Sequence, residues 1–260
     1  MQAPAIGWYP GHMARAIRRL GEDLRSVDTV VEVVDARLPL SGRNPGLARL
    51  AARKRLLLVL TRADLADPNA TAAWLEYFRA RGSEALAIDA KRTSDGTRLR
   101  ANLCRLATQR ATSRAMVVGI PNAGKSTAIN AIAGKSIARA ENRAGVTRAP
   151  QWFRIASNLE LLDTAGILVP KIDSPEAQWK LALIGAVPSA RFDPEDAIAR
   201  LGLWMAARGR EDAVDLETFS QERGFLRRGT IVDTHNAAWS YIKDLNAGTF
   251  GRMTLEEPPA

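Results

Sequence analysis

The sequence has a single cysteine, two histidines and few aromatic residues, which make up 6% of its 260 positions. Cys104 therefore has no partner for an internal disulfide bond, which agrees with a reducing compartment. No run of about 18 apolar residues occurs, so we expect no transmembrane helix and no membrane partner. The start of the chain also lacks an apolar segment behind a basic one, so we expect no secretory signal. These absences predict a cytoplasmic location.

Acidic residues are in the minority, with 28 Asp and Glu against 37 Lys and Arg, and the net charge is +9. One interpretation is an arginine-biased surface without a partner. The other is a polyanionic partner, and we favour ribosomal RNA because a planar guanidinium group binds phosphate and stacks on bases. The charge alone does not decide between them.

The first 148 residues alternate between short apolar strands and amphipathic helices. With 46% hydrophobic and 25% charged residues, the composition is that of a globular protein. The predicted strands are residues 29–36, 55–64, 83–90 and 114–120, and the predicted helices are residues 12–28, 70–82 and 96–109. Helices of this length between strands imply a parallel sheet with right-handed crossovers.

The pattern changes after residue 148. Residues 149–156 and 159–166 are apolar segments separated only by Ser157 and Asn158, which predicts a hairpin and one antiparallel edge strand. From residue 174 onward only helices are expected, so we predict domains at residues 1–173 and 174–260.

Two of the C-terminal helices carry clear end signals. Asp193 and Pro194 are typical of the N-cap and first position of a helix over residues 193–209, and a further helix is expected over residues 213–224. The last predicted helix, residues 233–248, ends at Gly248 and has Trp239, Ile242 and Leu245 on one face.

The segment "GIPNAGKS", residues 119–126, matches the phosphate-loop pattern G-x-x-x-x-G-K-[ST] between a predicted strand and a predicted helix. Gly119 and Gly124 allow a tight turn that exposes backbone N–H groups to phosphate. Lys125 supplies a positive charge to the β- and γ-phosphates, and the Ser126 hydroxyl group can bind Mg²⁺. This placement disfavours the alternative of a glycine-rich turn with an exposed lysine.

The segment "LELLDTAG" follows at a distance typical of the second switch of a GTPase. Asp163 would hold Mg²⁺ directly or through water, and the N–H group of Gly166 would meet the γ-phosphate. Between the two motifs, Thr147 is the candidate Mg²⁺ ligand of the first switch. Its alternative is an ordinary loop hydroxyl group.

The base-recognition motif lies upstream, in "LVLTRADLAD", where Thr61, Arg62, Ala63 and Asp64 follow an apolar strand. Asp64 would accept hydrogen bonds from N1–H and the 2-amino group of guanine, which adenine lacks. In the next loop, "AIDAK", the Ala90 N–H group would meet guanine O6 and Lys91 would lie beside the base.

The motifs are therefore circularly permuted, with base recognition first, then the phosphate loop, then the switches. All these loops follow parallel strands, so sheet position and not chain order determines the site. The predicted fold is α/β: a circularly permuted Ras-like P-loop GTPase domain, mostly parallel with one antiparallel edge strand, plus a small all-α C-terminal domain.

In this order, "WYPGHMARA", "GIPNAGKST", "AGVTRAPQWF" and "DTAGILVPK" together resemble the RbgA/YlqF family of ribosome-biogenesis GTPases, over nearly the whole chain. Relatives include a mitochondrial ribosome GTPase. The resemblance implies GTP or GDP with Mg²⁺ and a monomer away from the ribosome. It also implies a large ribosomal subunit precursor that stimulates hydrolysis, in the bacterial cytoplasm rather than in mitochondria.

The resemblance also implies roles for individual residues. His12, in the "WYPGHM" segment, takes the catalytic role, because Ile167 replaces the glutamine that positions water in Ras-type enzymes. The alternative for His12 is a structural imidazole on a turn. Asn122 lies where related GTPases hold K⁺. The implied nucleotide-binding loop comprises Gly119, Pro121, Asn122, Ala123, Gly124, Lys125, Ser126 and Thr127.

Two departures from the family pattern concern the base. Thr61 and Arg62 replace the usual Asn-Lys pair, so an amide that bonds guanine N7 and ties loops together is missing, and we expect an affinity loss of about 1–3 kcal/mol. Arg62 can still cover the base with its flat guanidinium group. Asp89, which we include among the nucleotide-binding residues, replaces a serine, and the sequence offers no account of this change.

Three functional hypotheses follow. The first is a GTP-hydrolysing assembly factor for the large ribosomal subunit. The alternative is a nucleotide-gated rRNA-binding module with weak or no turnover, and the third is a small-molecule kinase. The basic residues of the C-terminal part indicate either rRNA contact or a solvated face: Arg223, Arg227, Arg228, Lys243 and Arg252.

Overall fold

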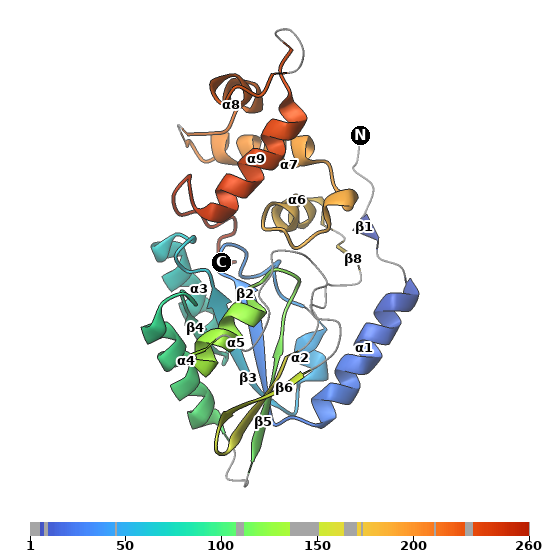
Figure 1. Ribbon diagram of the computed structural model, residues 1–260, viewed down its shortest axis with the longest axis vertical. Helices are drawn as coiled ribbons and strands as arrows, with labels where there is room; N and C mark the ends of the chain where they lie inside the picture. The colour runs from blue at the N-terminus through green and yellow to red at the C-terminus, as the bar shows by residue number, and fades with distance from the viewer. Residues whose placement is uncertain are drawn as a thin grey trace. The chain divides into compact units, whose positions relative to one another are not determined.

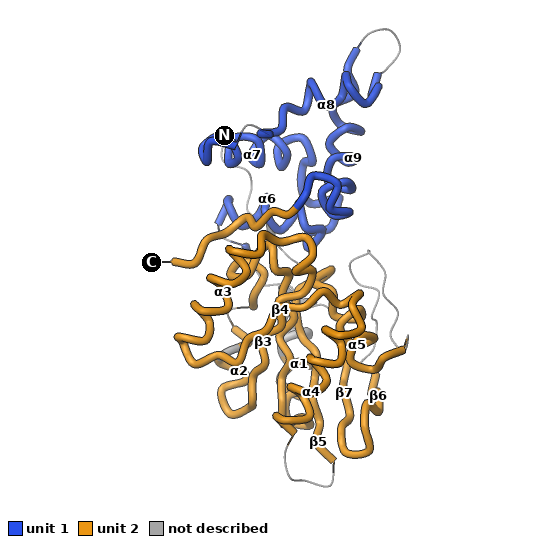
Figure 2. Tube along the Cα trace, turned by 90° about the vertical axis from the view of Figure 1, so that its left-hand side faces the viewer, with its two compact units in different colours: residues 1–6, 172–251 blue, residues 7–171, 252–260 orange. Residues whose placement is uncertain are grey.

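The computed structural model describes residues 6–7, 10–44, 46–107, 112–135, 151–163, 171–172, 174–210, 212–226 and 231–259. The chain divides into two compact units, coloured separately in Figure 2. We call residues 7–171 with 252–260 the sheet unit, and residues 1–6 with 172–251 the helical unit. The sequence-based division at residue 173 differs at both ends of the chain, because residues 1–6 group with the helical unit and residues 252–260 with the sheet unit.

The sheet unit is built on six strands: β2 (Thr29–Asp35), β3 (Arg55–Thr61), β4 (Glu84–Ala87), β5 (Ser113–Val118), β6 (Gln151–Ala156) and β7 (Leu159–Asp163). Their spatial order is β4-β3-β2-β5-β7-β6 (Figure 1). Every pairing is parallel except that of β6 with β7. The predicted mostly parallel sheet with one antiparallel edge strand is confirmed.

The strand order contains a reversal that locates the site. From β2 the chain proceeds outward through β3 to β4, and from β5 it proceeds the other way to β7. The reversal therefore lies between β2 and β5, and ligands of open α/β sheets bind at the carboxyl ends of the strands at such a point. All seven residues of β2 are buried, as expected of a central strand.

Helices cover both faces of this sheet. They are α1 (Pro10–Arg25), α2 (Leu47–Leu50), α3 (Pro68–Ala80), α4 (Thr93–Leu106) and α5 (Lys125–Ala133). Leu20 and Leu24 of α1 and Leu47 of α2 share a core with Met116 and Leu162 of the sheet. In Figure 1 the strands separate α1 from α4 and α5. The sequence does not predict α2, because four residues are too few to show helical periodicity.

The helical unit contains α6 (Pro175–Leu183), a 3₁₀ turn η1 (Ser189–Arg191), α7 (Pro194–Ala206), α8 (Leu216–Glu222) and α9 (Thr234–Ala247). The predicted caps are confirmed, because the Asp193 carboxylate accepts from Glu195 N, and Gly248 ends α9 in the left-handed conformation with φ 84°. Ile242 and Leu245 are buried, and Trp239 is half-buried against Phe192.

A separate two-stranded sheet pairs β1 (Ile6–Gly7) with β8 (Lys171–Ile172). Among the described helices, none is long and apolar enough to cross a bilayer.

Candidate functional site

The loop after β5 has a backbone that only glycine permits at two positions. A Cβ atom on Gly119 would lie 2.2 Å from the carbonyl oxygen of Val33, in the neighbouring strand β2. Gly124 has a φ of 87°, and its Cβ atom would lie 3.3 Å from Oγ1 of Thr61. The sequence pattern therefore reflects close contact between this loop and the ends of two other strands.

The remaining positions of the loop lead into α5. Asn122 has a positive φ of 60°, which asparagine tolerates better than most residues. Pro121 and Ala123 are buried. Ser126 and Thr127 fall in the first turn of α5, whose N–H groups and dipole favour an anion. This is the geometry that a phosphate group requires.

Lys125 is the buried charge of the loop, with 8% of its surface exposed. Its Nζ atom donates to the carbonyl oxygen of Ile120, at 2.8 Å. Burial lowers the pKa of Lys125 to about 8, although the negative charge of Asp163 acts in the opposite direction. A phosphate group would favour the charged form further.

Asp163 lies beside the loop because β7 pairs with β5. Its Cα partner in β5 is Val117, near the end of the strand from which the loop begins. The carboxylate is buried, with 4% of the residue exposed. A carboxylate and the Ser126 hydroxyl group are the oxygen ligands that Mg²⁺ prefers, so these residues fit the predicted metal. Thr147, Gly166 and Ile167 lie outside the described residues.

Thr61 connects the base-recognition segment, residues 61–64, to the phosphate loop. Its Oγ1 atom donates to the carbonyl oxygen of Ala123 at 2.6 Å, and the carbonyl oxygen of Val34 lies 3.1 Å from the same Oγ1 atom. Sequence reasoning assigned this tie between loops to an amide that the chain lacks. The structure shows that the threonine hydroxyl group makes such a tie, whereas the missing bond to guanine N7 stays a prediction.

Arg62 lies against a buried carboxylate. It has a left-handed backbone with φ 54°, and its NH1 atom is 3.7 Å from Oδ2 of Asp35 at the end of β2. Burial lowers the pKa of Arg62, although the charge of Asp35 acts in the opposite direction. The structure therefore gives Arg62 an ion-pair partner that the sequence did not predict, and the stacking of its guanidinium group on the base stays a prediction.

Sequence reasoning also missed Asp35 and Arg37. Asp35 is fully buried and accepts from Nε and NH2 of Arg37, at 3.0 and 2.8 Å. Burial by itself raises the pKa of Asp35, but Arg37 and Arg62 outweigh it, so the pKa lies below its ordinary value. The available signal was an acid at the end of a valine-rich strand, with an arginine two residues later.

The next loop explains Asp89. Its Oδ1 atom accepts from the backbone N–H group of Lys91 at 3.0 Å, and its own N–H group donates to Asp95 at 2.8 Å. Asp89 therefore shapes the turn that contains Ala90, as aspartate often does. Lys91 Nζ in turn lies 3.4 Å from Oδ2 of Asp64, so the two predicted base contacts face each other.

Residues 252–259, which we call the C-terminal strap, run along the same part of the sheet unit. The N–H group of Met253 donates to Leu65 O, and that of Leu255 donates to Arg37 O, each at 2.9 Å. Both strap side chains are buried, with 3% and 2% exposed. The strap therefore bonds to backbone groups that closely follow Asp35 and Arg62 in the sequence.

Polar groups of the strap complete this contact. The Glu256 carboxylate accepts from the N–H groups of Leu40 at 2.8 Å and Ser41 at 3.1 Å. The Glu256 carbonyl group accepts from Trp74 Nε1, and Thr254 Oγ1 accepts from Asp67 N. No sequence pattern indicated this role.

His12 falls in the first turn of α1, which begins at Pro10, so its backbone is helical and not part of a turn. Its side chain, and all of Trp8 and Tyr9, lie outside the described residues. Of the basic residues singled out in the C-terminal part, Lys243 and Arg252 are exposed, and Arg223 lies 3.3 Å from Asp244. Arg227 and Arg228 lie outside the described part.

Comparison with known proteins identifies the family. A family model described as 50S ribosome-binding GTPase matches residues 114–193. Ribosome biogenesis GTPase A of Bacillus cereus is 36% identical, over 97% of this chain and 94% of that protein. Its counterpart in Thermotoga maritima is 33% identical, over 97% and 95%. The chain belongs to the ribosome biogenesis GTPase A family.

Solved structures agree with this assignment. GNP-bound YlqF from T. maritima matches with a TM-score of 0.75 at 30% identity, covering 94% of this chain and 98% of that one. A GDP-bound structure of TM YlqF gives 0.74 at 30% identity, covering 93% and 99%. The predicted permuted GTPase fold and the family resemblance are confirmed. The chain is a GTPase, which cleaves GTP to GDP and phosphate, and GTPases use Mg²⁺ with the nucleotide.

Proposed function

We propose that this GTPase assists assembly of the large ribosomal subunit, and that the subunit precursor and its rRNA stimulate hydrolysis. The contact between Thr61 and Ala123 carries the proposal, because it joins a segment suited to a guanine base to a loop suited to phosphates. The relatives named ribosome biogenesis GTPase A support the partner.

Each residue of the site has a defined task in this proposal. Asp64 accepts from the guanine edge, Ala90 donates to O6, and Lys91 and Arg62 flank the base. The N–H groups of Gly119 to Thr127 bind the phosphates, and the Lys125 ammonium group stabilises the charge that develops on them.

The metal and the water complete the proposal. Mg²⁺ would be held by Ser126, Thr147 and Asp163, and would neutralise phosphate charge when bound. Gly166 donates to the γ-phosphate, and Asn122 is the candidate K⁺ ligand. His12 orients the water that attacks the γ-phosphate once the ribosomal subunit is bound.

Hydrolysis of GTP, measured with and without purified large subunits, tests this function. We expect a low rate alone and a sharp rise with subunits. His12→Ala should lower the stimulated rate by about a hundred-fold or more while leaving GDP affinity unchanged. His235→Ala is the matched control, since His235 is the chain's other histidine and lies in α9. An unchanged rate with subunits contradicts the proposal.

The alternative is a nucleotide-gated rRNA-binding module with weak or no turnover. It is motivated by the ion pair of Arg62 with Asp35, which engages the guanidinium group that would otherwise cover the base. Calorimetric titration with GDP, GTP and ATP analogues distinguishes the two. Nucleotide-dependent binding to subunits without phosphate release favours the module.

The relatives also bear on location. The bacterial proteins support the predicted cytoplasmic location. Mitochondrial ribosome-associated GTPase 1 of Mus musculus is 36% identical, but the match covers only 69% of this chain and 60% of that protein. We therefore retain the bacterial cytoplasm as the proposal, with a monomer away from the ribosome.

A further inference from the structure

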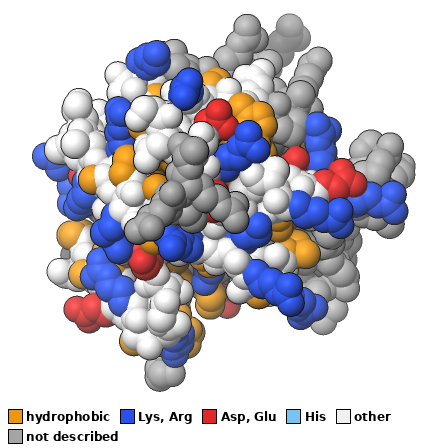
Figure 3. Space-filling model, turned by 90° about the horizontal axis from the view of Figure 1, so that it is seen from below, with side chains coloured by type: hydrophobic (Ala, Val, Ile, Leu, Met, Phe, Trp, Pro, Cys, Tyr) orange, Lys and Arg blue, Asp and Glu red, His pale blue; other side chains and the backbone are white. Residues whose placement is uncertain are grey.

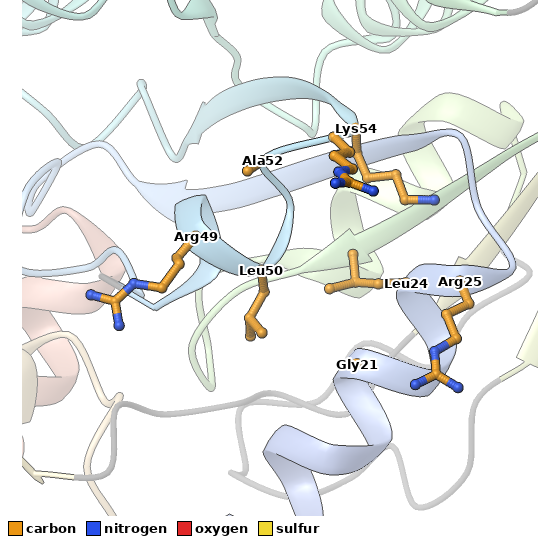
Figure 4. Close-up of a pocket in the computed structure, with 8 residues that line it drawn as sticks. Gly21, Leu24, Arg25, Arg49, Leu50, Ala52 and Lys54 are labelled. Atoms are coloured by element: carbon orange, nitrogen blue, oxygen red, sulfur yellow. The ribbon is translucent and has the colours of Figure 1, made fainter.

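A pocket in the sheet unit, away from the phosphate loop, has a strongly basic lining. It has a volume of about 370 Å³ and lies between the C-terminal half of α1 and the segment from α2 to the start of β3 (Figure 4). The lining residues are Gly21, Leu24, Arg25, Arg49, Leu50, Ala52, Arg53 and Lys54. Four of these eight are cationic and none is acidic.

The position of the pocket follows from the packing of the two helices. Leu24 is buried in the core that α1 and α2 share, and it is one of the residues that line the pocket. Leu50 is 43% exposed, although it belongs to the same wall. The pocket thus presents apolar surface together with several cationic side chains.

The cations differ in how they are held. Lys54 is half-buried, and its Nζ atom donates to the carbonyl oxygen of Val27 at 2.7 Å. Arg25, Arg49 and Arg53 are exposed. In Figure 4, Arg25 and Arg49 lie on opposite sides of Leu50 and Leu24. Three guanidinium groups around one opening suit a ligand with more than one phosphate.

Figure 3 shows many Lys and Arg side chains and fewer Asp and Glu on the face seen from below. Other arginines of the sheet unit are already paired within the protein, as Arg105 is with Glu84 and Arg114 with Glu160. The pocket arginines have no such carboxylate beside them in the lining.

We propose that this pocket binds the sugar-phosphate backbone of single-stranded RNA, with phosphates on the three arginines and a ribose or base on Leu24 and Leu50. Guanidinium groups form paired hydrogen bonds with phosphate oxygens, and apolar side chains contact unstacked nucleotides. The inference rests on the proposed function, since it assigns part of the rRNA contact to the sheet unit.

The triple variant Arg25→Gln/Arg49→Gln/Arg53→Gln tests the pocket. The matched control, Arg79→Gln/Arg81→Gln/Arg105→Gln, removes the same charge from exposed arginines on α3, α4 and the turn after α3. Binding to purified large subunits and to a short single-stranded RNA is measured at several salt concentrations. Circular dichroism and GDP binding verify that both variants fold.

We expect the pocket variant to bind RNA about ten-fold more weakly or worse. The slope of its RNA affinity against salt concentration, on logarithmic axes, should correspond to about two to three fewer released counterions. The control should lose much less. Equal losses in both variants, or no loss in either, overturn the inference. Competition by polyglutamate as effective as competition by RNA overturns the assignment to RNA.

The two probes separate this inference from the proposed function. If the wild type fails to bind subunits, the proposed function fails. Binding of the short RNA by the wild type and by the pocket variant then decides whether the pocket binds RNA. If the wild type binds subunits, and the pocket variant binds subunits and the short RNA as tightly as the wild type does, only the inference about the pocket fails.

Discussion

Thr61 joins two loops of the proposed nucleotide site through a single hydroxyl group, and the consequence of removing that group can be measured. Thr61→Val keeps the shape of the side chain but leaves the Ala123 carbonyl group without its donor. We expect a loss of about 1–3 kcal/mol in unfolding free energy and weaker GDP binding.

Chemical denaturation and GDP titration measure these two effects. Thr71→Val is the control, because its hydroxyl group bonds to Asp67 O within the first turn of α3. If both variants bind GDP as tightly as the wild type does, the Thr61 contact has no part in nucleotide binding.

If Lys125 binds phosphate as proposed, the affinity for GDP should depend on pH. Its pKa of about 8 means that the ammonium group loses its proton as the pH rises through that value, whereas phosphate binding requires the charged form. We expect GDP affinity to be constant below about pH 7 and to fall by up to ten-fold per unit above about pH 8.

The lowered pKa of Lys125 has the opposite effect on the stability of the protein without nucleotide, which should rise with pH. The folded pKa lies below the ordinary value of 10.5, so this group's contribution to folding becomes more favourable as the pH rises from about 8 toward that value. Lys125→Arg, which does not titrate in this range, is the control for the GDP titration. An equally steep decrease in that variant would exclude Lys125 as the cause.

The C-terminal strap is the element with the clearest measurable role. Glu256→Gln weakens the charged acceptor of the Leu40 and Ser41 N–H groups. Because the strap contacts the segments beside Asp35 and Asp64, we expect about 1–2 kcal/mol of destabilisation and a several-fold loss of GDP affinity. Affinity for pyrophosphate alone, which needs only the phosphate loop, should not change.

Glu257→Gln, the exposed neighbour, is the control for this measurement. Equal losses of GDP and pyrophosphate affinity in the Glu256 variant would indicate a general loss of structure. They would not support a role in holding the base-recognition segment.

Elements whose signals are local in the sequence were predictable. The hairpin of β6 and β7, the parallel strands, the Asp193 cap and the Gly248 end all depend on residues within a few positions of one another. The phosphate loop was predictable for the same reason, because Gly119 to Ser126 form one continuous motif.

Contacts between distant segments were not predictable. Glu256 lies 216 positions from Leu40, and neither residue belongs to a periodic pattern that would indicate the pairing. The Thr61 bond to Ala123, 62 positions away, depends on strand order and on a loop conformation that glycine permits. Asp89 appeared anomalous because its turn is visible only in three dimensions.

At the scale of the whole molecule, the division into two units predicts two unfolding events. The proposed nucleotide site lies in the sheet unit, so we expect GDP at about 100-fold over its Kd to stabilise that unit alone, by about 2.7 kcal/mol. Scanning calorimetry should show one transition that moves with GDP and one that does not, and ADP should move neither. A single transition that moves with GDP would mean that the units unfold together.

The position of the strap in the chain affects how the protein is made. Synthesis delivers the N-terminal residues first, so β2, β3 and the base-recognition segment leave the ribosome before residues 172–251. The strap, which binds Leu65, Arg37 and Trp74, leaves the ribosome only after residues 172–251 have left it. A newly made chain can therefore form its phosphate loop early, but it completes the support of its base-recognition segment only after residues 252–257 have been translated.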